Sequence, residues 1–116
     1  MAVIGFEPTR RIEYADGREF GDVGAYEQID ATLHFAVDPQ HPANSSIVDL
    51  ALAPRDGDGC VRFSADFSVV FPSDARRASG VVLVELPNRG RRRVIDMLNR
   101  SGAEAAASPA AGDGFL

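Results

Sequence analysis

The clearest pattern in this chain is a strict alternation of apolar and polar positions in two segments. In Ala25–Val37 every second residue is mostly apolar, and the residues between them are mostly polar. Cys60–Phe71 alternates in the same way, with Phe63, Phe67 and Phe71 on one side. A period of two is typical of strands that bury one face. We expect two half-buried strands whose phenylalanines supply much of the core, each contributing about 1.5–3 kcal/mol when fully buried.

Shorter elements surround these two strands. Thr9–Tyr14 is a β-prone run, and Ile47–Ala53 is a short apolar segment that Pro54 ends. The turn at Asp56–Gly59 is rich in Asp and Gly and is suited to join its neighbours as a hairpin. Together these features predict an antiparallel β region over residues 1–75.

A different pattern begins at residue 80. Val81–Leu86 is apolar on both sides until Glu85. A strand of this kind is usually covered on both faces, as in the parallel sheets of α/β proteins. Pro87 ends the run, and Val94–Arg100 has the apolar residues of a short helix. Residues 80–100 are therefore expected to form a buried strand, a turn and a helix.

The remaining residues, 101–116, are small and flexible in composition, and they end in Phe115 and Leu116. Two large apolar residues at this point resemble the start of a further strand. With 116 residues the chain is long enough for one small domain. We expect a single segment over residues 1–116 that is apparently interrupted after its first buried strand and helix.

Net charge narrows the possible partners. The chain carries a formal charge of −5, which argues against a general nucleic-acid binder. Residues 1–75 hold 5 Arg and 13 acidic residues, giving −8, and residues 76–116 hold 7 Arg and 4 acidic residues, giving +3. Solvated surfaces explain this contrast more simply than a binding patch does. No nucleic-acid partner is expected.

The familiar catalytic and cofactor motifs are missing from the sequence. It has no G-x-S-x-G elbow, no Walker loop and no dinucleotide fingerprint, so no cofactor is expected. His34 and His41 lie far apart without a local ligand cluster, which argues against a metal site. Cys60 is the single cysteine and forms no internal disulfide. Neither a signal peptide nor an apolar run of membrane-spanning length is seen, so a cytoplasmic location without membrane contact is expected.

The stretch "NRGRRR" directly after the apolar run has three interpretations. Its arginines decorate a loop and a helix start, or Arg91–Arg93 bind an anionic partner, or Asn88, Arg89 and Gly90 form a functional turn. Open α/β sheets place ligands at the carboxyl ends of their strands. Gly90 permits a sharp turn that aims backbone N–H groups at an oxyanion. A purely structural turn, with Arg89 paired to an acidic residue, is equally compatible with these residues.

Five ordered segments, which span most of the chain, resemble a family of bacterial α/β-hydrolase-domain proteins. They are "FGDVGAYEQIDA" (Phe20–Ala31), "VDPQHPANSSIVDLALAP" (Val37–Pro54), "GCVRFSADFSVVFPSD" (Gly59–Asp74), "VELPNRG" (Val84–Gly90) and "GDGFL" (Gly112–Leu116). The resemblance implies an α/β fold, β-rich in this portion, in which antiparallel strands lead into the first buried strand and helix of a hydrolase-type sheet. It also implies that the chain is the N-terminal part of a longer protein.

In that family setting, Val81–Leu86 is the strand before the oxyanion loop, and the Asn88–Gly90 turn stands where many α/β-hydrolases carry a His-Gly motif. Gly112–Leu116 opens the next strand. The nucleophile, acid and histidine would lie beyond Leu116, so the resemblance assigns no catalytic residue to this chain.

The leading functional hypothesis is therefore the oxyanion-side part of an ester or acyl hydrolase. In this hypothesis the nucleophile lies beyond Leu116, with a complementing C-terminal polypeptide as one possible source, and Arg89 orients a carboxylate-bearing substrate or locks the loop. The alternative is a small β-rich binding or interaction module that uses Arg91–Arg93 on an anionic partner. A gene fragment without function is a third possibility.

Overall fold

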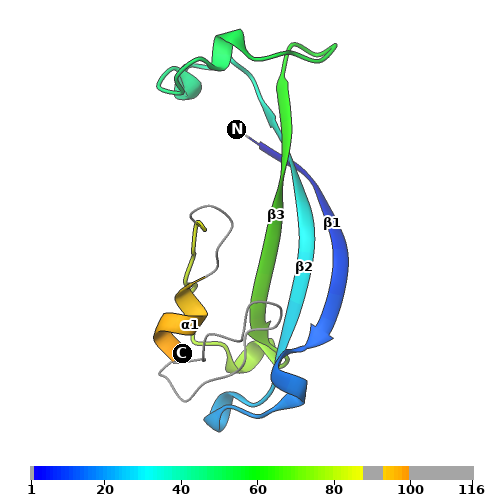
Figure 1. The fold of residues 1–116 in the computed structure, drawn as a ribbon, viewed down its shortest axis with the longest axis vertical. Helices are drawn as coiled ribbons and strands as arrows, with labels where there is room; N and C mark the ends of the chain where they lie inside the picture. Colours follow the sequence, from blue (N-terminus) through cyan, green and yellow to red (C-terminus); the bar gives the residue numbers. More distant parts are fainter. Residues whose placement is uncertain (1, 88–92, 100–116) are drawn as a thin grey trace. The chain divides into compact units, whose positions relative to one another are not determined.

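The computed structural model describes residues 2–87 and 93–99, and these residues contain one sheet and one short helix (Figure 1). The strands are β1 (Ala2–Glu13), β2 (Tyr26–Val37) and β3 (Val61–Pro72), and the helix is α1 (Val94–Asn99). The strands follow one another in the order β1-β2-β3 and are antiparallel. Short 3-10 turns occur in the segments that connect the strands.

The two strongest sequence predictions are confirmed. The alternating segments at residues 25–37 and 60–71 form β2 and β3, each within one residue of the expected ends. The third strand is longer than expected. The pattern predicted Thr9–Tyr14, whereas β1 begins at Ala2 and ends at Glu13.

One register relates β2 to β3 along their length. The backbone N–H of Ser73 donates to the carbonyl of Ala25 at 2.9 Å, and further along the strands the rings of Phe35 and Phe63 stack. Both pairs fit the same uninterrupted antiparallel register. Odd-numbered residues of β2 and β3 therefore share one face of the sheet, because side chains alternate along a strand.

The chain divides into two compact units. The first comprises Met1–Ile12 and Gln28–Val70, and the second comprises Glu13–Glu27 and Phe71–Leu116. In the first unit Ala31 and Val37 are buried on β2. The loop after β2 is held by Asn44, whose buried amide donates to the carbonyl of Asp38 at 2.8 Å. This bond satisfies a polar side chain that would otherwise be costly to bury.

The second unit is organised around aromatic rings. Tyr14 is buried, its ring centroid lies 6.1 Å from that of Phe20, and the Phe20 ring meets the Tyr26 ring edge-on at 5.6 Å. The guanidinium of Arg18 lies 5.3 Å from the Phe20 ring centroid, within the range of a cation–π contact. Gly24 has a φ of 85°, which a glycine adopts without strain, and its carbonyl accepts from the Phe20 N–H.

The expected buried strand at Val81–Leu86 is wrong. Its residues adopt no regular structure, and its apolar side chains are exposed, from 55% for Leu83 to 90% for Leu86. A strand that is apolar on both sides needs paired neighbours on its edges and cover on its faces. The described residues supply neither for this segment. The helix expected after it is present as α1.

The fold class is corrected accordingly. The described residues form a β-rich fold around a three-stranded antiparallel sheet, and not the first part of an α/β-hydrolase-type sheet. The resemblance placed a parallel-sheet strand at Val81–Leu86, and that strand is the element that the structure does not contain. Residues 101–116, including the further strand expected at Phe115 and Leu116, lie outside the described residues.

Candidate functional site

Four phenylalanines from all three strands lie on one face of the sheet in the first unit. Phe6 comes from β1, Phe35 from β2, and Phe63 and Phe67 from β3. The alternation of β2 and β3 places their three rings on the odd face, and the contact of Phe6 with Phe67 places Phe6 there too. We call the surface formed by these four phenylalanines and by Ala31 and Ala65, which share this side of the sheet, the aromatic face.

The rings of this face form two pairs. Phe35 and Phe63 are stacked, with centroids 4.8 Å apart and planes 11° apart. Phe6 and Phe67 meet edge-on, with centroids 6.2 Å apart and planes 75° apart. Phe6 and Phe67 belong to the two outer strands, so their contact passes over β2. The register places Ala31 beside Phe67, and Ala31 is only 4% exposed.

The aromatic face is nevertheless open to solvent. Phe6 is 50% exposed, Phe63 is 46% exposed, and the neighbouring Ile4 of β1 is 49% exposed. Ala65, between Phe63 and Phe67 on β3, is exposed as well. The expectation that Phe63, Phe67 and Phe71 supply much of the core is therefore wrong for the described residues. None of the three is buried, and the buried hydrophobic residues are Tyr14, Ala31 and Val37.

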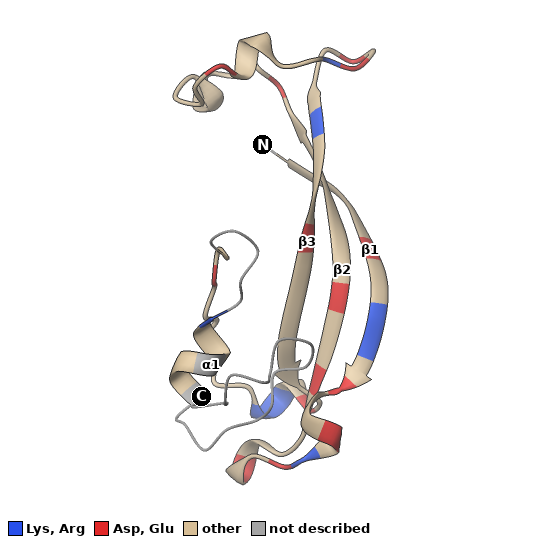
Figure 2. Cartoon of the chain, in the orientation of Figure 1, with Lys and Arg blue, Asp and Glu red and all other residues tan. Residues whose placement is uncertain are grey.

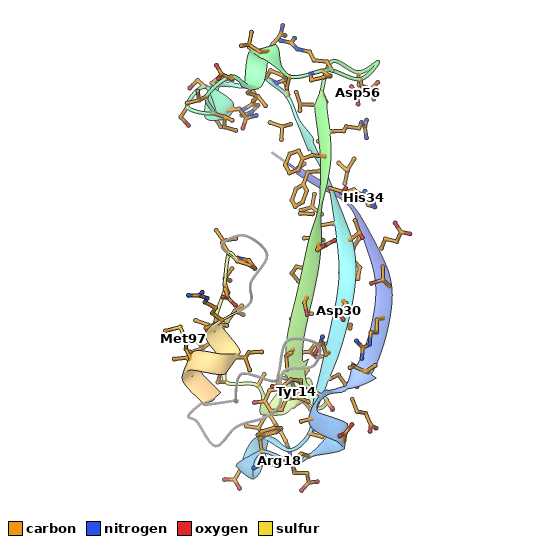
Figure 3. All side chains as sticks on the ribbon, in the orientation of Figure 1. Tyr14, Arg18, Asp30, His34, Asp56 and Met97 are labelled. Carbon is orange, nitrogen blue, oxygen red and sulfur yellow. The ribbon has the colours of Figure 1, made fainter. Side chains whose placement is uncertain are left out.

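The opposite face of the sheet is polar. His34 of β2 lies 3.2 Å from the carboxylate of Glu7 on β1, and Gly5 leaves space for the His34 ring. On the same strand the buried Gln28 amide donates to the carboxylate of Asp30 at 2.9 Å. Figure 3 labels Asp30 and His34 on β2, and Figure 2 shows acidic positions along the same strand. The sheet is therefore amphipathic, with aromatic side chains on one face and polar side chains on the other.

A second polar cluster lies at the turn before β3. The Asp56 carboxylate accepts from the backbone N–H groups of Asp58 and Cys60, each at 2.9 Å, and pairs with the Arg62 guanidinium. The hydrogen bond from Arg62, followed by that from Cys60, holds the pKa of Asp56 below its ordinary value. These partners occupy the carboxylate within the turn itself, so the cluster has a structural explanation.

Two arginines of the more basic C-terminal part, Arg76 and Arg77, also form local contacts. Arg76 donates to the Asp74 carboxylate through Nε at 2.9 Å and through Nη2 at 3.0 Å. This hydrogen-bonded pair lowers the pKa of Asp74. Arg77 donates to the carbonyl of Asp22 at 3.1 Å. The positive charge of these residues is therefore partly neutralised or engaged with backbone.

The residues that the sequence proposed for a site lie largely outside the described part of the chain. Asn88, Arg89 and Gly90, the candidates for an oxyanion turn, fall there, as do Arg91 and Arg92. Arg93 is described and exposed. Both the oxyanion turn and the arginine cluster stay predictions.

Sequence reasoning missed the role of Glu85. This residue was expected to interrupt a buried strand, but its carboxylate accepts from the backbone N–H groups of Arg93 at 2.7 Å and Val94 at 3.2 Å. It therefore caps the first turn of α1, where negative charge is favourable. The available signal was an acidic residue a short distance before a predicted helix.

Within residues 2–87 and 93–99, no group of three or more His, Cys, Asp or Glu side chains is placed to hold a metal ion. Neither is any helix in this part of the chain long and apolar enough to cross a membrane. The most distinctive functional feature of the described residues is thus the aromatic face.

In comparisons with known proteins, no family model, no curated protein and no solved structure matches this chain. The resemblance to α/β-hydrolase-domain proteins accordingly stays a prediction.

Proposed function

We propose that this chain is a protein-interaction module that buries its aromatic face against a second apolar surface. The observation that carries the proposal is the half-exposed state of Phe6 and Phe63 within a four-ring cluster. A sheet with one apolar face gains stability by packing that face against another layer. Aromatic side chains, phenylalanine among them, are also enriched in protein interfaces relative to the rest of the surface.

The proposed function is still that of a β-rich interaction module, but its contact surface is the aromatic face. The sequence alternative relied on Arg91–Arg93 and an anionic partner, whereas the described residues favour an apolar partner. The two versions differ in their response to salt. Binding through arginines weakens as salt rises, because salt screens exposed charges. Binding through the phenylalanines depends mainly on apolar area and is largely insensitive to moderate salt.

The hydrolase hypothesis, with an ester or acyl substrate and a complementing C-terminal polypeptide, stays a prediction of the resemblance. Its proposed site residues, Asn88, Arg89 and Gly90, lie outside the described residues. A cytoplasmic location is likewise a proposal, which fractionation of cells that express the chain would test.

Site-specific photocrosslinking in those cells tests the interaction proposal. Phe63 is replaced by p-benzoylphenylalanine in one variant, and Ser64 is replaced in a matched control. Both positions are exposed and adjacent on β3, but their side chains point to opposite faces of the sheet. We expect a discrete crosslinked product from position 63, with little or none from position 64.

A second variant checks that the crosslink depends on the aromatic face. Ala65→Asp places a charge between Phe63 and Phe67, and it should abolish the product at position 63. Equal crosslinking from positions 63 and 64, or no product from either, would overturn the proposal.

A further inference from the structure

We propose that the surface covering the aromatic face is the aromatic face of a second copy of this chain, so that two sheets pack face to face as a symmetric dimer. This inference rests on the proposed function and names its partner. In such a dimer each copy contributes the same residues to the interface, as a two-fold axis requires. The two sheets would lie about 10 Å apart, with their side chains interdigitated.

The charge pattern of the face supports self-association. On the odd positions of β2 from Ile29 to Val37, and of β3 from Val61 to Val69, no residue is charged. On β1 the same face is uncharged from Ile4 to Pro8, and charge returns at Arg10. A surface that meets its own copy must avoid placing like charges opposite one another. The aromatic face meets this condition over its whole central part.

The sizes of the side chains also suit a second copy. Along β3 the face alternates between large and small residues, in the order Phe63, Ala65, Phe67. Ala65 is exposed, so it forms a low point between two rings. Layers that alternate large and small side chains interdigitate well. A ring from the second copy therefore fits over Ala65, and by symmetry the reciprocal contact forms at the same time.

The area available predicts a weak dimer. In this unit β2 and β3 each contribute ten residues, Gln28–Val37 and Val61–Val70. At about 3.3 Å per residue and about 4.8 Å between strands, three strands offer about 475 Å² per copy. Two copies together bury about 950 Å², which is near the lower limit for specific interfaces. We expect a dimer that forms and dissociates with concentration rather than a permanent one.

Pairing through the β1 edge is a less suitable route to association. Pro8 lies within β1 and has no backbone N–H to donate to an added strand. Proline on an edge strand is a common device against edge-to-edge pairing. The face therefore offers a better contact than this edge does.

Sedimentation equilibrium of the purified full chain tests the inference. The wild type should change from monomer to dimer between about 1 µM and 1 mM, the range expected for a small interface. Ala65→Asp should weaken dimerisation at least tenfold. Ser64→Asp adds the same charge on the same strand but on the polar face, and it should change the dissociation constant by less than about twofold. Circular dichroism verifies that each variant keeps its β structure.

If Ala65→Asp loses its β structure, Phe63→Thr replaces it, because threonine retains a strand preference while removing the ring. The same tenfold weakening is expected for this variant. Equal effects of the variants on the two faces would overturn the inference.

The outcome also separates the inference from the proposed function. A chain that stays monomeric up to 1 mM, yet crosslinks at position 63 to a different protein in cells, overturns the second-copy proposal and leaves the interaction module intact. A chain that is monomeric and shows no face-specific crosslink overturns both. A dimer sensitive to Ala65→Asp, with a crosslinked product of twice the chain mass, supports both.

Discussion

The rings of Phe35 and Phe63 stack across β2 and β3, with centroids 4.8 Å apart and planes only 11° apart. This contact couples two strands that are far apart in sequence. It also places a flat aromatic surface at the solvent side of the sheet, because Phe63 remains 46% exposed.

The stack should contribute measurably to stability. In a double-mutant cycle with Phe35→Leu and Phe63→Leu, urea unfolding should reveal a coupling energy of about 0.5–1.5 kcal/mol, the range for aromatic pairs beyond their buried area. Leucine keeps most of the apolar surface, so the cycle isolates the ring–ring term. Additive effects of the two substitutions would contradict a direct interaction between the rings.

The pair of Asp56 and Arg62 should make stability depend on acid. Arg62 lowers the pKa of Asp56 in the folded chain below its ordinary value of 3.8. Asp56 therefore contributes stability above the unfolded pKa, and this contribution is lost as pH falls through the lower folded pKa. Arg62 is exposed and Asp56 is only half-buried, so solvent screens the pair and we expect a small effect.

A carboxyl-carbon NMR titration measures this directly. The midpoint of Asp56 should lie below 3.8 in the wild type and move upward in Arg62→Gln. An unchanged midpoint in the variant would show that Arg62 is not the main cause of the shift.

The Val81–Leu86 segment should exchange its amide hydrogens quickly. Its side chains are exposed, and the residue pairings of the sheet do not include it. In hydrogen-exchange mass spectrometry at low protein concentration, peptides from this segment should exchange much faster than peptides from β2. Protection equal to that of β2 would mean that the segment is paired in solution, as the sequence originally suggested.

The purified chain alone should not hydrolyse esters. Its sequence contains no G-x-S-x-G elbow, and the hydrolase hypothesis assigns no catalytic residue to it. A p-nitrophenyl ester assay should therefore show no turnover above the buffer rate. Turnover that disappears on substitution of a single residue of this chain would contradict this expectation.

Sequence patterns predicted β2 and β3 well because apolar and polar side chains alternate between the two faces of each strand. The alternation in Ala25–Val37 and Cys60–Phe71 has the period of two that an extended strand imposes on its side chains. The first half of β1 was harder to recognise, because Gly5 and Pro8 weaken its strand character. Both residues are tolerated in an outer strand, where one edge forms no ladder.

The error at Val81–Leu86 has a different origin. The apolar composition of a segment indicates how much free energy its burial would contribute. It does not indicate whether another part of the chain is available to cover it. The same limit applies to the candidate site. The sequence placed Phe63 and Phe67 on one face, but the contribution of Phe6 depends on its contact with Phe67 over β2, which only the three-dimensional arrangement shows.

The most direct test of the central claim is hydroxyl-radical footprinting of Phe63 as a function of protein concentration. At about 1 µM, where a weak dimer is dissociated, Phe63 should be modified readily, because nearly half of it is exposed. Near 1 mM its modification should slow several-fold, while exposed residues on the polar face keep their rates. Strong protection of Phe63 at both concentrations would mean that the aromatic face is already covered within a single chain, and it would contradict the account.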